Sequence, residues 1–303
     1  MTVDRSTILR GPGTVTRGQT FFDKDNITAT VMAERWDVPT SAEGVVDIRK
    51  KDQNAKISFK PCGSMTADIL AALYPYATPN IGASMFGATD TAAVVQSKAG
   101  TKITFHATAL TKQPELILSA VETAFGDAEM TALVKNSTDP STANSLFTVA
   151  SQAWAAPALL SASIKTVKYT ATWGAKTFTS PNGFRVIPEI QTSPIYIDGL
   201  GTVDYTLTGA SIMVKCRPAN FAEADFESMP AQGTAIGATL RGSNNLVIVG
   251  VGGLTVTIYN AQMVEGPLVW GATELRVGEV GFIGHRVETA GAYGALFAVG
   301  LTA

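Results

Sequence analysis

The chain has 303 residues, 46% of them hydrophobic and only 16% charged, and its formal net charge is −2. This length suits two domains of about 150 residues each, and the lack of a basic tail or stripe excludes tight binding to a nucleic-acid backbone. Because there is no apolar run of about 18 residues and no apolar segment near the start, we expect no membrane span and no secretory signal. The low charge fraction predicts a surface partly covered by other subunits.

Alternating apolar and polar side chains are the main signal along the chain. This period-two pattern is typical of half-buried strands, and it occurs in the segments 56–60, 103–108, 165–173 and 254–259. Segment 114–125 has the length of a helix, but we interpret it as strand. We interpret the glycines of 250–253 as a bend or bulge within a strand. The pattern therefore predicts a mainly β protein.

Helical signals are few. Segment 64–77 has apolar residues at helical spacing, with Ser64 or Thr66 as the candidate N-cap. The sequence of 220–223 is a capping box that would open a second short helix.

An internal repeat is the most informative feature of the sequence. With an offset of 157 residues, which carries Gly44 onto Gly201, segment 20–68 aligns with 177–225 without a gap, and a weaker match follows downstream. The strongest matching pairs are Phe21 with Phe178, Gly44 with Gly201, Asp47 with Asp204, Pro61 with Pro218, and Asp68 with Asp225.

The repeat predicts two tandem units, 1–140 and 164–303, joined by a connector at 141–163. Each glycine of the aligned pair would start a strand after a long loop, and Asp68 and Asp225 would lie in the first turns of the two helices, where the helix dipole favours an acid. A duplication of this kind favours a ring of quasi-equivalent units over an active site.

Residues that could carry chemistry are sparse. No phosphate-binding loop or nucleophile elbow is present. The histidines, His106 and His285, and the cysteines, Cys62 and Cys216, are too widely separated to suggest zinc. Asp47 and Asp204 could be read as paired carboxylates, but we favour a shared turn or an intersubunit hydrogen bond. We therefore expect no catalytic residues, no cofactor and no metal.

Several stretches, taken together, resemble the major tail-tube proteins of long-tailed, siphovirus-like phages and prophages. They are Gly11–Phe22, Gly44–Ile48, Lys56–Pro61, Pro114–Ser119, Thr170–Gly174 and Asn182–Val186.

The resemblance implies a β-sandwich or barrel with a short flanking α-helix, here present in two tandem copies. It also implies a non-enzymatic virion protein, assembled in the host cytoplasm, whose stacked rings form the tail tube. The partners would be further copies of the chain, a tape-measure protein, and tail terminator and baseplate proteins. DNA would be a transient cargo of the lumen, and no membrane would be involved.

The repeat adds a stoichiometry to that expectation. Six folds around a ring would need three duplicated chains, so we expect a homotrimer with pseudo-sixfold symmetry. We also expect a neutral to negative lumen that lets DNA slide. The two long loops 32–43 and 189–200 would be inter-ring contact arms, with Trp36, Val38, Ile195 and Tyr196 as apolar anchors.

Three alternatives remain open. The chain could be a related ring protein of a tail terminator, a baseplate or a secretion tube, which copy number would separate from the major tube subunit. It could be a cell-surface or carbohydrate-binding β-sandwich, which predicts a monomer with a ligand cleft. A hydrolase on a β scaffold is disfavoured, because no nucleophile and base accompany the carboxylates.

Overall fold

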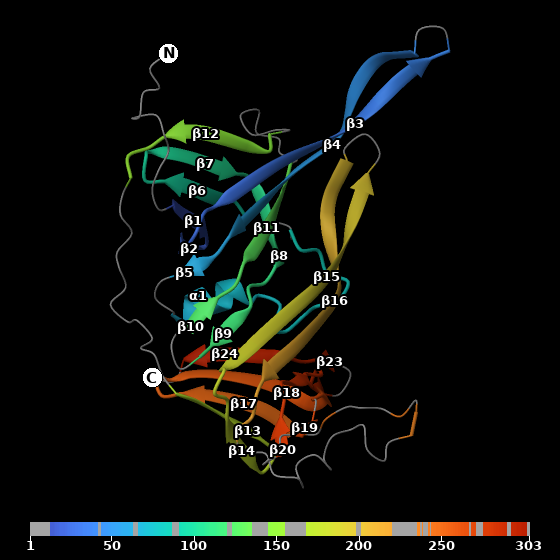
Figure 1. Cartoon of the computed structure of the whole chain (residues 1–303). Helices are drawn as coiled ribbons and strands as arrows, with labels where there is room; N and C mark the ends of the chain where they lie inside the picture. The colour runs from blue at the N-terminus through green and yellow to red at the C-terminus, as the bar shows by residue number, and fades with distance from the viewer. Residues whose placement is uncertain are drawn as a thin grey trace.

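The protein is mainly β and sandwich-like, with several antiparallel sheets and one helix among the residues that the structure describes (Figure 1). No helix in this part of the chain is long and apolar enough to cross a membrane. The computed structural model describes residues 13–41, 44–62, 66–86, 91–119, 123–134, 145–154, 168–197, 201–219, 235–236, 238, 242, 244–266, 268–270, 275–289 and 292–301.

Two sheets come from the first half of the chain, in the orders β12-β7-β6-β1-β2-β5 and β3-β4-β11-β8. The strands of the first are β12 (Phe147–Ser151), β7 (Thr101–Phe105), β6 (Ala93–Ser97), β1 (Gly13–Arg17), β2 (Gln19–Asp23) and β5 (Pro61–Cys62). Those of the second are β3 (Thr28–Thr40), β4 (Gly44–Phe59), β11 (Ala128–Leu133) and β8 (Ala107–Lys112).

A larger sheet contains the second half, in the order β10-β9-β15-β16-β21-β18-β17-β13-β14, with β24 also on β18. Its strands are β10 (Thr123–Phe125), β9 (Leu116–Leu118), β15 (Phe184–Ile197), β16 (Gly201–Cys216), β21 (Val280–Ile283), β18 (Leu254–Glu265), β17 (Asn244–Gly250), β13 (Tyr169–Trp173), β14 (Lys176–Thr179) and β24 (Phe297–Leu301). Two small hairpins pair β19 (Leu268–Trp270) with β20 (Leu275–Val277), and β22 (Glu288–Thr289) with β23 (Ala292–Tyr293).

Strand order is the same in the two halves. The run β12-β7-β6-β1-β2 corresponds to β24-β18-β17-β13-β14, and β3-β4-β11-β8 corresponds to β15-β16-β21-β18. Strand β18 serves in both runs because it turns at Asn260, which has a φ of +46°. The first half instead breaks at His106, between β7 and β8. The amide of His106 donates to the carbonyl of Leu146, just as that of Tyr259 donates to Leu296.

The irregularities of the two long hairpins also coincide. The β3–β4 ladder shifts register between Glu34 and Arg35 and again between Val38 and Pro39. The β15–β16 ladder shifts at the same two places after the offset of 157, at 191/192 and at 195/196. A bulge inserts a residue and increases the local twist of a strand, so the two hairpins are bent at matching points.

The core is built from the faces that the alternation predicts. Ala171 and Trp173 on β13, and Leu254, Val256 and Ile258 on β18, are buried. One apolar cluster runs through both halves of the chain, so the halves share a core.

The residues matched by the repeat take corresponding places in this core. Phe21 and Phe178 are both buried on the second strand of a short hairpin, facing Val15 and Ala171 in the ladders. Pro61 and Pro218 are also buried, each just beyond the end of a long strand.

Helix α1 (Ala67–Leu73) confirms the first helix signal. The side chain of Thr66, not Ser64, caps it by accepting a hydrogen bond from the Ile69 amide at 3.2 Å, and Asp68 lies in its first turn. The buried face of α1 carries Leu70 and Leu73. The capping box at 220–223 and Asp225 lie outside the described residues.

Two expectations need correction. Segments 32–43 and 189–200 are not long loops: their described residues belong to β3, β4, β15 and β16, because each hairpin partner satisfies the backbone groups that a loop would leave to water. The glycines of 250–253 form the turn between β17 and β18, closed by the bond from the Gly253 amide to the Gly250 carbonyl. In addition, β12 lies within 141–163, the expected connector, and pairs with β7.

Candidate functional site

Two projecting hairpin ends form the most distinctive surface of the chain. We call residues 32–40 and 44–53 the first arm, and residues 189–197 and 201–210 the second arm. Both arms extend from the body in the same direction (Figure 1). Gly44 and Gly201 start the returning strands with φ values of +74° and +80°, a conformation that favours glycine.

The tip of the second arm rests against the side of the first arm. The hydroxyl of Thr202 donates a hydrogen bond to Oδ2 of Asp52 at 2.6 Å. The ammonium of Lys51 lies 5.8 Å from the centroid of the Tyr196 ring, within the range of a cation–π contact. The arms are therefore linked to each other within one chain.

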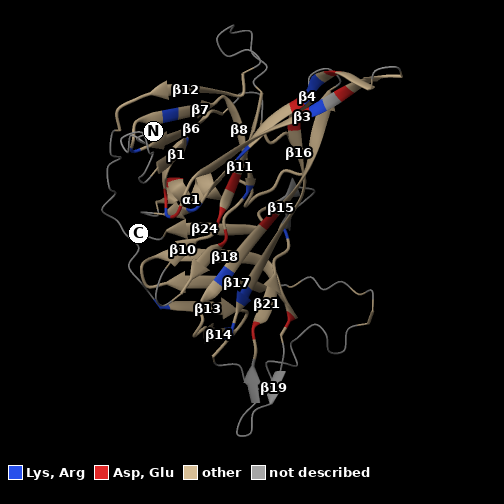
Figure 2. Cartoon of the chain, turned by 45° about the horizontal axis from the view of Figure 1, so that its top comes forward, with Lys and Arg blue, Asp and Glu red and all other residues tan. Residues whose placement is uncertain are grey.

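Charges on the first arm are paired and balanced. Ion pairs join Arg35 to Asp37, Arg49 to Asp47 and Lys51 to Glu34, at 3.5, 3.4 and 3.3 Å. Figure 2 shows both signs interspersed along β3 and β4. Exposed pairs of this kind contribute little to stability. The three consecutive basic residues 49–51 each have an acidic or amide partner in the same arm, so the charge that the described part presents to a polyanion is balanced.

Apolar side chains are nevertheless exposed on both arms. On β4 they lie directly after the turn, and on β15 directly before it. The set comprises Val45, Val46, Ile48, Ile195, Tyr196 and Ile197. Of the predicted anchors, Ile195 and Tyr196 belong to this set and Val38 is half-buried, while the side chain of Trp36 lies outside the described part. Apolar clusters on projecting elements mark interaction surfaces.

A junction inside the chain joins the two halves through β9 and β15. Strand β9, from the first half, pairs antiparallel with the start of β15 and extends the sheet of the second half. Arg185 on β15 makes two hydrogen bonds to the carboxylate of Glu115, at 2.5 and 3.1 Å. These bonds to Glu115 raise the pKa of Arg185.

A second part of the junction joins the segment after α1 to β16. The amides of Gly82 and Met85 donate to the carbonyls of Leu207 and Tyr205, both at 2.8 Å, and the amide of Phe86 donates to Oδ1 of Asp204 at 3.3 Å. A small apolar cluster packs beneath these bonds: Met85, Phe86, Ala107, Ala109, Leu133 and Leu207.

The repeated aspartates share one local hydrogen bond and differ in a second contact. Asp47 and Asp204 each accept from the amide of the next residue, at 2.8 and 2.7 Å. Asp204 also accepts across the junction from the Phe86 amide, whereas Asp47 lies beside Arg49 on the exposed first arm. The two carboxylates are thus placed for structural hydrogen bonds, and the described contacts bring no base or nucleophile to them.

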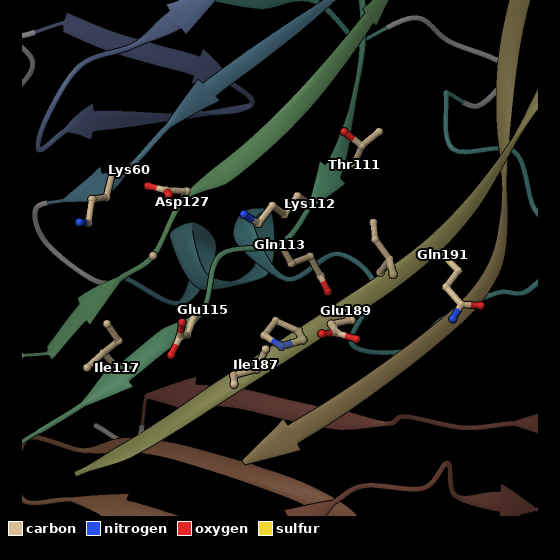
Figure 3. Close-up of a pocket in the computed structure, with 13 residues that line it drawn as sticks. Lys60, Thr111, Lys112, Gln113, Glu115, Ile117, Asp127, Ile187, Glu189 and Gln191 are labelled. Carbon is tan, nitrogen blue, oxygen red and sulfur yellow. The ribbon is translucent and has the colours of Figure 1, made fainter. Parts of the chain in front are cut away.

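A hollow of about 440 Å³ lies in the seam between the halves (Figure 3). Its walls mix carboxylates and lysines with amides, a threonine hydroxyl and aliphatic groups, and they include no serine, cysteine or histidine. The lining residues are Lys60, Thr111, Lys112, Gln113, Glu115, Ile117, Gly126, Asp127 and 187–191.

The described residues offer little to a metal or a redox partner. They contain no group of three or more His, Cys, Asp and Glu side chains that could hold a metal ion. Cys62 and Cys216 are free thiols, half-buried and buried respectively. Burial raises the pKa of both, that of Cys216 to about 12.

The junction segment contains a short repeated motif that an alignment of the two halves at the single offset of 157 does not detect. The junction segment starts Ile81-Gly-Ala-Ser84, and the second half contains Ile236-Gly-Ala-Thr239 at an offset of 155 (81 to 236). A search that let the offset drift by two residues (157 to 155) would have found this pair. It marks a candidate counterpart of the junction segment in the second half.

Comparison with known families and proteins adds no identity to this picture. No family model matches the chain, and no curated protein is significantly similar to it.

Proposed function

We propose that the chain is a structural subunit that polymerises as stacked rings into a tube of the phage-tail type, which conducts DNA. The observation that carries the proposal is the match between the halves. They share strand order, hairpin bulges and the positive-φ glycines Gly44 and Gly201. A chain of two like units already contains one copy of the contact that a ring would repeat.

The arms support the stacking part of the proposal. They project from the body and expose aliphatic and aromatic side chains at their ends. A neighbouring ring could cover these groups, and aromatic residues such as Tyr196 carry a disproportionate share of interface energy. In this proposal the arms contact the adjacent ring.

The charge distribution supports passage of DNA rather than binding. The chain has 23 basic and 25 acidic side chains, and its formal net charge is −2. A balanced surface releases few counterions, so it would not grip phosphates. A lumen lined by such residues would let a duplex slide.

Electron microscopy of the purified chain tests the proposal. Negative staining should show rings or tubes, and ring mass should correspond to three chains of 31.7 kDa, about 95 kDa. A strictly monomeric protein at high concentration would end the proposal. Rings with six chains would end the trimer but keep the tube.

A related ring protein of a terminator, baseplate or secretion tube has the same structural support, and abundance in assembled particles separates it from a major tube subunit. A carbohydrate-binding module is less well supported. The seam hollow has no aromatic side chain in its lining, whereas small-molecule sites are lined mainly by hydrophobic and aromatic groups.

A further inference from the structure

We infer that one copy of the chain joins the next by strand addition, with β19 pairing antiparallel to the outer edge of β3. No described strand covers this edge, because β3 pairs with β4 alone in its sheet. The inference deepens the proposed function and rests on it, since it specifies the contact between neighbouring chains within a ring.

The hairpins β9–β10 and β19–β20 are equivalent. In the first, Leu116, Ile117 and Leu118 pair with residues 125, 124 and 123. In the second, Leu268, Val269 and Trp270 pair with residues 277, 276 and 275. Three pairs and a four-residue connection therefore recur at an offset of 152 (116 to 268). Strand β9 is already used to extend the sheet that contains β15, and β19 is its counterpart.

Burial at the two acceptor edges shows what is missing. Val186 and Pro188 on β15, the strand that carries β9, are buried. The residues one offset earlier on β3 are Ala29 and Val31, and both are exposed, Val31 by 46%. The buried pair lies on β15, whose edge is joined by β9. The exposed pair lies on the equivalent strand β3, whose outer edge no described strand joins. Exposed, unpaired strand edges of this kind recruit further strands.

The pairing of β9 with β15 within the chain also gives the register expected for β19 on β3 of the next chain. Within the chain, Phe184, Arg185 and Val186 pair with Leu118, Ile117 and Leu116. The two offsets, 157 and 152, convert these pairs to Ile27 with Trp270, Thr28 with Val269, and Ala29 with Leu268.

The segment that begins at Ile236 supplies a second point of contact. Its counterpart at Ile81 pairs with β16 beside Asp204, so the Ile236 segment would pair with β4 beside Asp47. Ile236 is fully exposed. Asp47 would then gain the intersubunit hydrogen bond that Asp204 makes within the chain.

The two surfaces cannot meet within one chain. Strand β3 starts in the upper part of the body and runs to the tip of the first arm, whereas β19 lies at the lower end of the molecule (Figure 1). The contact is therefore heterologous, head to tail, and it gives a closed ring if the rotation per chain closes.

Engineered cysteines test the inferred register. Opposed residues in antiparallel strands have Cα atoms about 4.5–5.5 Å apart, which suits a disulfide. The double variant Thr28→Cys with Val269→Cys should, on mild oxidation, give covalent oligomers on a non-reducing gel, ending at the trimer if three chains close. A mixture of the two single variants should give dimers only, each containing one chain of each kind.

A matched control uses Met32→Cys with Val269→Cys. Met32 is exposed on the same strand, four residues from Thr28, which places it about 13 Å away. It should give at least tenfold less cross-linked product. The single variants also report any background from Cys62 and Cys216.

The outcomes separate the inference from the proposed function. Rings or tubes that do not cross-link, or that cross-link equally through Met32, would overturn the inferred register and leave the tube intact. Register-specific cross-links without tubes would support the inference and argue against the tube. A protein that stays monomeric and does not cross-link would overturn both. Circular dichroism spectra and melting curves matching the parent chain would show that the variants are folded.

Discussion

Gly44 and Gly201 share a backbone conformation but not its surroundings. Their φ values are +74° and +80°. A Cβ atom on Gly44 would meet nothing within 4 Å, whereas one on Gly201 would lie 2.5 Å from Oδ1 of Asp52. Asp52 cannot easily move aside, because it accepts hydrogen bonds from the Gln53 amide and the Thr202 hydroxyl. Gly201 of the second arm therefore packs closely against Asp52 of the first arm, whereas Gly44 has no such neighbour.

Alanine substitutions at these two positions should distinguish the energetic cost of backbone strain from the cost of lost packing. Gly44→Ala should lower the free energy of unfolding by about 1–2 kcal/mol, the cost of a left-handed backbone for an L-residue. Gly201→Ala should cost a further 1–3 kcal/mol or so, because it also displaces Asp52. Urea unfolding measures both variants. Equal losses would show that the arms do not pack as described.

Mutation of the two repeated aspartates should affect stability and assembly differently. Asp204→Ala removes the acceptor for the Phe86 amide across the junction and should lower the free energy of unfolding by about 1–2 kcal/mol. Asp47→Ala, on the exposed arm, should change it by less than about 0.5 kcal/mol but should weaken assembly. Thermal denaturation and light scattering check the two effects. An Asp47 variant that assembled like the parent chain would count against the inferred contact with the next chain.

Sequence reasoning found the strands that have one buried face. Tyr169, Ala171 and Trp173 alternate with polar residues because the sandwich buries one side of β13 and not the other. The same reasoning missed the arms. At the end of β15, for example, the residues from Pro194 to Ile197 are exposed on both faces, so no period-two signal remains.

The contacts that build the candidate surface have no local signal. Thr202 and Asp52 are separated by 150 positions, and nothing in either segment identifies the other as its partner. The repeat was recognisable from the sequence where its two copies are identical, as at Gly44 and Gly201. Its continuation at Ile236 was hidden, because the change of offset breaks an ungapped alignment.

Blocking the edge of β3 should weaken assembly without unfolding the chain. Val31→Lys places a charge on this edge strand, two residues beyond the inferred pairs, and charged side chains are a device by which natural edge strands avoid pairing. Val249→Lys on β17 is the matched control, since the exposed fractions of the two side chains are 46% and 44%. Sedimentation velocity should show smaller species for Val31→Lys alone. If both variants assembled equally well, β3 would not be the edge in use.

The two native thiols should differ in reactivity. A raised pKa lowers the thiolate fraction at a given pH, and the thiolate is the reactive form. With its pKa raised to about 12 by burial, Cys216 should be unmodified by Ellman's reagent at pH 8 until the chain unfolds. Cys62, which is half-buried, should react first, and faster as the pH rises. Mass spectrometry of trapped samples assigns the sites, and rapid labelling of Cys216 in the folded chain would contradict its burial.

The arm ends supply the last prediction. Tyr196→Ala should slow or abolish tube growth while leaving the fold intact, because the ring is about half exposed and its described intrachain partner is the ammonium of Lys51. An exposed cation–π contact is worth only about 0.5–1 kcal/mol, so the melting temperature should fall by a few degrees at most. Trp36→Ala should act in the same way if the first arm is also an inter-ring contact.

The matched control for the arm variants is Val251→Ala, which truncates an exposed side chain in the turn between β17 and β18. If the arms contact the adjacent ring, tube length in electron micrographs should shorten for the Tyr196 and Trp36 variants and not for the control. The cross-linking pair at Thr28 and Val269 should still form closed rings in the Tyr196 variant, because that contact lies within a ring. Tubes of normal length from either arm variant would remove that arm from the stacking contact, and loss of ring cross-links would place Tyr196 in the contact between neighbouring chains instead.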